Sequence, residues 1–342
     1  MIDIKLLEQL CLCNGISGDE GNVRNLIINE IKDCADDIKT DNLGNLIVFK
    51  KGKKSAKSKL MVSAHMDEVG LMVTDITSDG YLKFDEVGGI DRRVLPGKRV
   101  CVGRNGLNGV IGLKPIHLTN GDEKTAVPKM SDMYIDIGAE SREDALKYVN
   151  YGDGINFEGD FKINGKTVVT KALDDRFGCY VLINLIKSEP EYDMYFTFVV
   201  QEEVGLRGAR PAAFTVNPDF ALVIESTTAA DVAEVDASHQ VCNLSKGATV
   251  AVMDRATVHD KEMISAAFEL AEKNNIAVQY KRAVAGGNDS GAIHQSRGGV
   301  RTLAVSLPSR YIHAPSTAAN LDDCESVLKL AKVLSDYIAG GN

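Results

Sequence analysis

The sequence lacks the segments that direct a chain into or across a membrane. No apolar run within its 342 residues approaches the ~20 residues that a spanning helix requires. Its first residues, MIDIKLLEQLCLCNG, carry no basic segment ahead of an apolar stretch, so we expect no secretory signal. The seven cysteines are scattered and include no C-x-x-C pair. Reduced thiols and a cytoplasmic location are therefore expected.

The sequence also has fewer basic than acidic residues. Lys and Arg number 39 against 48 Asp and Glu, which gives a formal net charge of −9. We expect such a chain to bind neither nucleic acid nor, as a cationic protein would, a membrane surface. Hydrophobic residues make up 44% of the chain, which is enough for a folded core. The length of 342 residues favours about two domains.

Several catalytic and nucleotide-binding motifs are absent as well. There is no G-x-x-x-x-G-K-[ST] loop, no G-x-S-x-G elbow and no H-E-x-x-H helix. Gly103, Gly106 and Gly109 do not have the spacing of a dinucleotide fingerprint, and we interpret them as turn glycines.

The chain divides into three zones. Residues 1–68 and 165–342 alternate helical patterns with compact β-rich runs, which predicts an α/β fold with a mostly parallel mixed sheet between helix layers. Residues 69–164 are a string of short apolar runs separated by Gly, Asp and Asn, which is typical of a small barrel or sandwich. We therefore predict one α/β domain made from both ends of the chain, with a small all-β, barrel-like domain inserted at 69–164.

Helical spacing of apolar residues predicts the helices of this arrangement. They are expected over 4–12, 23–31, 143–148, 177–186, 261–273 and 322–338. Ser17 and Glu20 match a capping box ahead of the second helix, and Ser141 is the expected cap of the third.

Acidic residues and histidines gather where predicted strands of the α/β domain end. The strands and the residues that follow them are 60–63 with His65 and Asp67, 167–170 with Asp174, 195–200 with Glu202 and Glu203, 220–224 with Glu225, and 302–306 with His313. In an open α/β sheet, ligands bind beyond the carboxyl ends of the strands. One site can therefore collect side chains from all five strands.

Imidazoles and carboxylates without a thiolate suit Zn²⁺, Co²⁺ or Mn²⁺. The charge of two divalent cations is balanced by Asp174, Glu203 and Glu225 together with a bridging hydroxide. If Asp174 is shared, each cation also receives one histidine and one carboxylate of its own. Open positions then remain for water and substrate, as a catalytic site requires.

Two further carboxylates lie next to these residues in the sequence. Asp67, two residues after His65, is placed to accept the other imidazole N–H and to fix the tautomer. Glu202 precedes Glu203, and adjacent residues point in different directions. One of the pair can therefore bind metal while the other faces the water as general base and then general acid.

The same residues fall in blocks that resemble a known enzyme family. The blocks are AHMDEVG (64–70), KALDDR (171–176), QEEVGLRGA (201–209), GGNDSGAIH (286–294) and SRYIHAP (309–315). In this order, over nearly the whole chain, they resemble the co-catalytic metallo-aminopeptidases. That family includes glutamyl aminopeptidases and tetrahedral, dodecameric aminopeptidases, and some members carry an endoglucanase label.

The resemblance implies a role for each site residue. His65, Asp174 and Glu225 are expected to hold one divalent cation, and Asp174, Glu203 and His313 the other. Glu202 is then the general acid/base, and Asp67 orients His65. The family places a cis peptide bond after the shared aspartate, which is Asp174–Asp175 here.

The resemblance also implies a zinc-exopeptidase type of fold and an activity. Two divalent metal ions activate a bridging water, and the enzyme removes the N-terminal residue from short peptides. The inserted β domain is expected to mediate dimerisation, and dimers are expected to assemble into a hollow tetrahedral dodecamer.

Two positions depart from the family pattern. Position 225 is Glu where many relatives have Asp, so the side chain is one methylene longer and metal spacing or denticity is affected, but not the ligand type. Residues 286–290 read GGNDS where relatives often read GGTDA. Because this loop is expected to border the substrate pocket, the preferred N-terminal residue stays open among acidic, aliphatic and basic side chains.

Two other functions stay open on the residues alone. Glu202 and Glu225 are imaginable as the carboxylate pair of a metal-independent glycoside hydrolase, although the histidines at the strand ends then have no role. The other is a non-catalytic assembly protein that keeps the metal cluster for structure, against which the intact Glu202 argues.

The remaining histidines and the methionines are expected to lie outside the chemistry. We expect His117, His239 and His259 at the surface or beside the metal ligands, and His294 in the core or at the surface. The methionines at 61, 66 and 72 are expected to fill core space.

Overall fold

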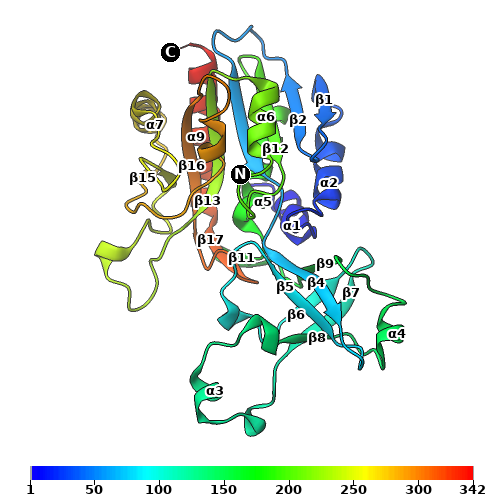
Figure 1. Ribbon diagram of the computed structural model, residues 1–342. Helices are drawn as coiled ribbons and strands as arrows, with labels where there is room; N and C mark the ends of the chain where they lie inside the picture. Colours follow the sequence, from blue (N-terminus) through cyan, green and yellow to red (C-terminus); the bar gives the residue numbers. More distant parts are fainter. Residues whose placement is uncertain (1, 342) are drawn as a thin grey trace.

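Two sheets organise the computed structural model, which describes residues 2–341 (Figure 1). The larger is an 11-stranded mixed sheet, and the smaller closes into a barrel. The strands of the large sheet are β1 (Asp37–Thr40), β2 (Leu46–Lys50), β3 (Leu60–His65), β10 (Lys162–Asn164), β11 (Thr167–Thr170), β12 (Met194–Val199), β13 (Phe220–Thr228), β14 (Ala248–Val250), β15 (Val278–Tyr280), β16 (Arg301–Arg310) and β17 (Thr317–Asn320).

Four parallel strands form the centre of the large sheet. Their order is β12-β3-β13-β16, and neighbouring strands pair in parallel. Every residue of β3 is buried, as expected for a strand covered on both faces. Antiparallel strands extend the sheet on either side, through β2 and β1 and through β17 and β11. The sheet is therefore mixed, with its parallel part at the centre.

The strand that precedes Asp174 points in the same direction as the central four. β17 pairs antiparallel with both β16 and β11, so β11 runs parallel to β16. The carboxyl ends of β3, β11, β12, β13 and β16 therefore face one edge of the sheet.

Helices cover both faces of the large sheet. The helices are α1 (Ile4–Leu12), α2 (Gly21–Ile31), α3 (Gly121–Thr125), α4 (Arg142–Ala145), α5 (Leu173–Lys187), α6 (Ala209–Val216), α7 (Lys261–Lys273), α8 (Ser290–Ile293) and α9 (Leu321–Ala339). On one face α1, α2, α5, α7 and α9 pack over a large apolar core, and on the other α6 and α8 cover a smaller one. In β3, Val62 belongs to the first core and Met61 to the second, which reflects the alternation of side chains along a strand.

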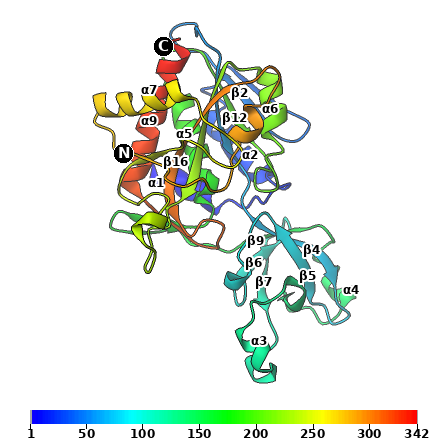
Figure 2. The same cartoon turned by 60° about the vertical axis from the view of Figure 1, so that its left-hand side comes forward.

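The barrel lies below the large sheet in Figures 1 and 2. Its strands are β4 (Gly70–Ile76), β5 (Leu82–Val87), β6 (Arg99–Val102), β7 (Leu107–Gly112), β8 (Tyr134–Asp136) and β9 (Gly154–Phe157), paired antiparallel in the closed order β4-β5-β8-β7-β6-β9 around their own apolar core. Together with the large sheet, this confirms the predicted fold class. β10, which falls in the range predicted for the insertion, already belongs to the large sheet.

Most predicted helices appear close to their expected positions. α7 has the predicted bounds, whereas α5 begins four residues earlier than expected and α4 is only one turn long. Ser141 caps α4, since its hydroxyl accepts a hydrogen bond from the Asp144 amide. α6 was not predicted. Pro211 discourages a helix there, but it lies in the first turn, where a missing N–H costs no intrahelical bond.

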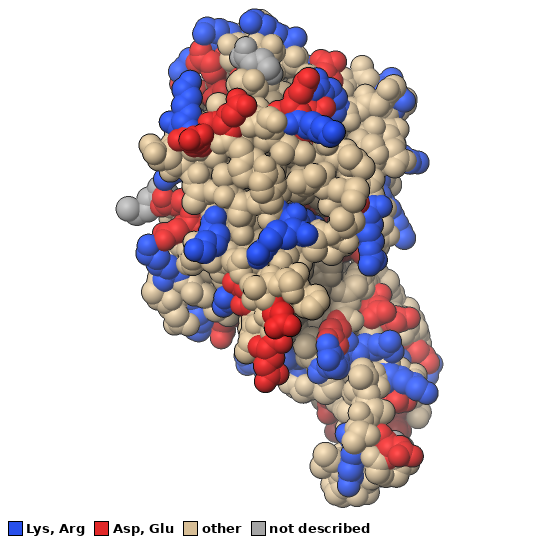
Figure 3. Space-filling view, turned by 90° about the vertical axis from the view of Figure 1, so that its left-hand side faces the viewer, with Lys and Arg blue, Asp and Glu red and all other residues tan. Residues whose placement is uncertain are grey.

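Within residues 2–341, no helix is both long and apolar enough to cross a membrane. Figure 3 shows acidic and basic side chains interspersed over one face of the molecule, with broad areas between them that carry neither.

Candidate metal centre and active site

Five strands bring their polar side chains to one edge of the large sheet. His65 is the last residue of β3, and Asp174 follows β11 at the start of α5. Glu202 and Glu203 follow β12, and His313 lies in the loop after β16. Glu225 differs slightly from expectation, because it lies within β13 and not after it.

His65, Asp174 and Glu225 form the first group of close side chains. The Nε2 atom of His65 lies 3.3 Å from Oδ1 of Asp174 and 3.7 Å from Oε2 of Glu225. One nitrogen or oxygen atom from each residue falls within 4.8 Å of the others, which fits three ligands around one cation. All three side chains are shielded from solvent, with His65 only 1% exposed.

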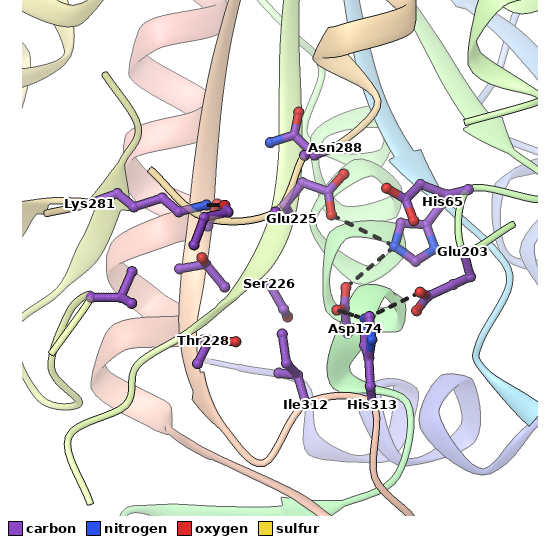
Figure 4. A pocket seen from close by; sticks show the side chains of 17 residues that line it. His65, Asp174, Glu203, Glu225, Ser226, Thr228, Lys281, Asn288, Ile312 and His313 are labelled. Atoms are coloured by element: carbon purple, nitrogen blue, oxygen red, sulfur yellow. Dashed lines mark hydrogen bonds and ion pairs between the residues drawn. The ribbon is translucent and has the colours of Figure 1, made fainter. Parts of the chain in front are cut away.

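Asp174, Glu203 and His313 form the second group. The Nε2 atom of His313 lies 3.5 Å from Oδ2 of Asp174 and 3.2 Å from Oε2 of Glu203. Asp174 thus presents one carboxylate oxygen to each histidine, as Figure 4 shows. This is the arrangement expected of a carboxylate shared between two cations. His313 is 37% exposed and forms the open side of the site.

The donor atoms fit a pair of divalent cations. Among residues 2–341, Oε1 of Glu225 has no hydrogen-bond partner, and Oδ1 of Asp174 has only Nε2 of His65 nearby, outside hydrogen-bond geometry. Burying carboxylate oxygens without a partner is costly, and a cation removes that cost. The set contains only imidazole nitrogens and carboxylate oxygens, which suit Zn²⁺, Co²⁺ and Mn²⁺. The residues could therefore hold two such ions, with Asp174 between them.

Burial and crowding shift the ionisation of these groups. Burial raises the pKa of Glu203 to about 7, and the nearby Asp174 carboxylate adds to that rise. Burial also raises the pKa of Glu225 well above its usual range. For His65, burial favours the neutral ring, but the carboxylates of Asp174 and Asp67 outweigh it and raise the pKa. Without metal, carboxyl groups and imidazoles this close would share protons. Divalent cations can replace those protons when they bind.

Asp67 is fully buried beside His65. Its carboxylate oxygen Oδ1 lies 3.5 Å from Nδ1 of His65, and the same nitrogen is 3.1 Å from the Asp67 carbonyl oxygen. Asp67 also accepts hydrogen bonds from the backbone N–H groups of Glu202 and Glu203 at 3.0 and 3.1 Å. It therefore fixes both the ring of His65 and the turn that carries the two glutamates.

Ser17 completes this arrangement, and the sequence analysis assigned it wrongly. Its hydroxyl donates to Asp67 at 2.6 Å and does not cap α2. The carboxylate of Glu20 accepts from the amides of Gly18 and Gln201. The predicted capping box is therefore not formed, and both side chains instead support the turn before Glu202.

Unusual backbone conformations surround the site. The peptide bond between Asp174 and Asp175 is cis, as the resemblance implied. Ala172, Gln201 and His313 have left-handed backbone conformations, with φ of 55°, 57° and 58°. Residues with a Cβ rarely adopt this region, and such strain concentrates at functional sites. Two of these residues come just before site carboxylates, and the third is itself in the site.

A pocket of about 350 Å³ opens beside the two groups. His65, Asp174, Glu202, Glu203, Glu225 and His313 line one end of it, and Ser226, Thr228, Asn288 and Ile312 line the rest with Lys281. Figure 4 shows Lys281 on the side of the pocket opposite His65. Its ammonium donates to the Ala285 carbonyl at 3.0 Å, and no ion pair with a carboxylate involves it within residues 2–341. The pocket thus has an acidic end and a cationic end.

The barrel contributes to the wall of the site. Gly88 and Gly89 follow β5, and a Cβ on Gly88 would lie 3.2 Å from Cβ of Glu203. A Cβ on Gly89 would lie 3.8 Å from Nδ1 of His313. The chain at Gly88 has φ of +83°, so glycine meets both the conformational and the steric demand there.

Sequence reasoning missed three groups near the site. Lys281 lies in no motif, and only its place after β15 could have linked it to the sheet edge. Asp289 is fully buried, and neither of its carboxylate oxygens has a hydrogen-bond partner in the described part of the chain, although its block had been singled out for another reason. The third group is a buried ion cluster of Glu68, Lys171 and Arg176.

The other histidines lie away from the two groups of close side chains. His117 and His239 are exposed, and His294 is half-buried. His259 is not at the surface, which was one of its two expected positions, because only 2% of it is exposed and its Nε2 lies 3.6 Å from Oδ2 of Asp254. The tight turn before it carries the residue inward, which a polar sequence context does not indicate.

Known proteins resemble this chain over almost its whole length. A model of the family described as M42 glutamyl aminopeptidase matches residues 44–330. A putative aminopeptidase of Acetivibrio thermocellus is 44% identical over 327 residues, which cover 95% of this chain and 96% of that protein. The lysyl aminopeptidase of Pyrococcus furiosus is 33% identical, with 99% of this chain and 98% of that protein covered. The solved structure of the TET1 peptidase of Pyrococcus horikoshii has a TM-score of 0.86 at 39% identity, covering 97% of this chain and 98% of that one. The chain therefore belongs to the M42 family of metal-dependent aminopeptidases.

Proposed function

We propose that this protein removes the N-terminal residue from short peptides, with two divalent cations and Glu202 as general acid/base. The observation that carries the proposal is the position of Asp174, whose two oxygens face His65 and His313 separately. His65, Asp174 and Glu225 would hold one cation, and Asp174, Glu203 and His313 the other. Zn²⁺, Co²⁺ and Mn²⁺ all suit these ligands. When bound, the cations supply Lewis acidity and lower the pKa of water.

Glu202 moves the proton in this proposal. It lines the same end of the pocket as the ligands, and burial raises its pKa well above the usual range for a glutamate. Its backbone amide is fixed by Asp67, which leaves the carboxyl group free to face the reacting water. The carboxylate accepts a proton as water attacks the scissile carbonyl carbon, and the acid returns it to the amine as the C–N bond breaks.

Asp67 has a positioning role in the same proposal. By accepting hydrogen bonds from the Glu202 and Glu203 amides, it keeps the acid/base and a metal ligand in a fixed relation. Its contact with Nδ1 leaves Nε2 of His65 for the cation.

Lys281 gives the pocket a cation away from the acidic end. The free α-amine of a peptide is attracted to the carboxylates, so the side chain of the first residue extends toward Lys281. We therefore expect the enzyme to favour substrates whose N-terminal residue is acidic.

We further propose that residues 1–68 and 165–342 form the catalytic unit and that the inserted barrel mediates dimerisation, with dimers assembling into a tetrahedral dodecamer. The long β7–β8 connection carries exposed apolar side chains, with Ile116 at 72%, Leu118 at 60% and Val127 at 54%. The Pyrococcus horikoshii relative assembles into a tetrahedron or a large octahedral shell. A reducing, cytoplasmic setting stays a prediction, with which the seven free cysteines agree.

Chelation tests the activity. EDTA should abolish hydrolysis of aminoacyl-p-nitroanilides, and Co²⁺ or Zn²⁺ should restore it after the chelator is removed. Hydrolysis of a β-glucan that survives EDTA would instead favour the glycoside hydrolase. A protein that binds metal but cleaves no aminoacyl-anilide would favour the non-catalytic assembly.

A further inference from the structure

A buried ion cluster lies directly behind the metal centre. The Glu68 carboxylate accepts hydrogen bonds from Nζ of Lys171 at 2.7 and 2.9 Å and from Nη2 of Arg176 at 3.3 Å. The three side chains are 5%, 3% and 0% exposed. Three charges removed from water this completely must be held by excellent geometry, since the desolvation cost is several kcal/mol per ion.

The cluster joins the two chain segments that carry the first group of ligands. Glu68 is three residues from His65, whereas Lys171 and Arg176 lie three residues before and two residues after Asp174. The segments are far apart in the sequence, yet His65 and Asp174 must stay within reach of one cation. Lys171 before Asp174 and Arg176 after it both form a salt bridge with Glu68. These two salt bridges fix the distance between the chain segments that carry His65 and Asp174.

Arg176 strengthens this connection through the backbone. Its Nε donates to the carbonyl oxygen of Met66, the residue that follows His65, at 2.8 Å. Its Nη1 donates to the carbonyl oxygens of Leu10 and Cys13, and its Nη2 to that of Gly15 as well as to Glu68. The five donors of the guanidinium thus have five acceptors. The β3 end and the end of α1 are therefore fixed to the start of α5 as one unit.

The cluster does not reach the substrate. None of its three residues lines the 350 Å³ pocket. Glu68 and Lys171 instead border a small cavity of about 10 Å³ together with Asp174, Glu203 and His313, which has room for about one water molecule. Glu68 and Lys171 thus share the walls of one small cavity with the metal centre.

We propose that Glu68, Lys171 and Arg176 are positioning residues that set the affinity of the metal centre by holding His65 and Asp174 at a fixed separation. The proposal rests on the ligand set of the proposed function. It assigns a purpose to three buried charges that neither bind substrate nor ligate metal. Residues that support metal ligands from outside typically contribute 10- to 100-fold to metal affinity.

The variant Lys171→Met tests this proposal most cleanly. It removes the ammonium but leaves Glu68 paired with Arg176, so no buried charge loses its last partner. The matched control is Lys50→Met, which removes another shielded lysine, one that donates to the Cys34 carbonyl and lies beside the first residue of β12, at the opposite end of that strand from Glu202. Lys171→Arg keeps a cation opposite Glu68 and is the variant to use if Lys171→Met does not fold.

Co²⁺ titration of the metal-free proteins, followed by visible absorption and chelator competition, gives the readout. We expect Lys171→Met to weaken at least one Co²⁺ site about 10- to 100-fold and to alter its absorption spectrum. Lys171→Arg should show a smaller loss, and Lys50→Met should bind like wild type even if its melting temperature falls. Folded Lys171 variants with wild-type affinities and spectra overturn the positioning role alone. A wild-type protein that binds no Co²⁺ overturns the proposed metal centre and this role together.

Discussion

The variant Glu202→Gln separates catalysis from metal binding in this enzyme. Glutamine keeps the length and shape of the side chain but cannot accept a proton at neutral pH. The backbone N–H of residue 202 still donates to Asp67, so the turn keeps its position. The five proposed ligands are untouched, so we expect two equivalents of metal in the variant as in wild type.

The size of the effect follows from the role assigned to Glu202. General acid/base groups contribute about 10²- to 10⁴-fold to rate, which corresponds to about 3 to 5 kcal/mol of transition-state stabilisation. The thermal stability of the variant, in contrast to its rate, should not fall. Within residues 2–341 the Glu202 carboxyl makes no hydrogen bond, and burial opposes its charge more than the nearby His65 favours it, so its pKa is raised. Removing that charge should leave the melting temperature of the metal-free protein unchanged or raise it.

The assay compares kcat/KM on aminoacyl-p-nitroanilides with metal content measured on the same samples. Glu272→Gln, an identical change on the exposed side of α7, is the control and should behave like wild type. If metal-loaded Glu202→Gln keeps activity within a few-fold of wild type, Glu202 is not the acid/base. If the variant loses its metal, the experiment instead assigns Glu202 to the ligands.

Two other predictions concern the pocket and the surface. Lys281→Met should lower kcat/KM about 10- to 100-fold for Glu- and Asp-p-nitroanilides, because it removes a charge-assisted contact. The kcat/KM for Leu-p-nitroanilide should stay within a few-fold of wild type. Equal losses on all three substrates would contradict the specificity role. For Asp231, burial alone raises the pKa, but the hydrogen bonds from Arg310 at 2.7 and 2.9 Å lower it below the usual range. The ion pair therefore stabilises the fold above the ordinary aspartate pKa, and this contribution is lost as the pH falls through the lowered pKa. Asp231→Asn should be about 1 kcal/mol less stable than wild type at pH 7. Thermal unfolding at a series of pH values should show this stability difference shrinking toward pH 2. A difference that stays constant with pH would refute this reasoning.

The fold and the grouping of the candidate metal-binding side chains were predictable because they follow from regular structure. Side chains after parallel strands meet at one edge whatever the details of packing, so His65, Asp174 and Glu203 could be grouped before any coordinates were known. The same logic separated the barrel from the α/β domain, because short strands divided by Gly and Asp differ in pattern from alternating helices and strands.

Long-range polar contacts were not predictable in the same way. Ser17 and Glu20 have the spacing of a capping box, but Asp67 and Gln201 lie 50 and 181 residues away and bind them more favourably. Lys281 follows a short strand at the sheet edge, and nothing in its sequence neighbours indicates that it lines the pocket. Such contacts depend on tertiary placement, which local patterns do not encode.

Gly88 and Gly89 bring the backbone of the barrel close to two residues of the candidate site. Because this backbone lies against Glu203 and His313, deleting the insertion would remove one of the surfaces beside these two side chains. Engineering that treats the barrel as an exchangeable module therefore has to preserve this glycine pair. A graft that placed any larger residue at position 88 would strain the backbone there, and its Cβ would lie 2.8 Å from Cγ1 of Val69 and 3.2 Å from Cβ of Glu203.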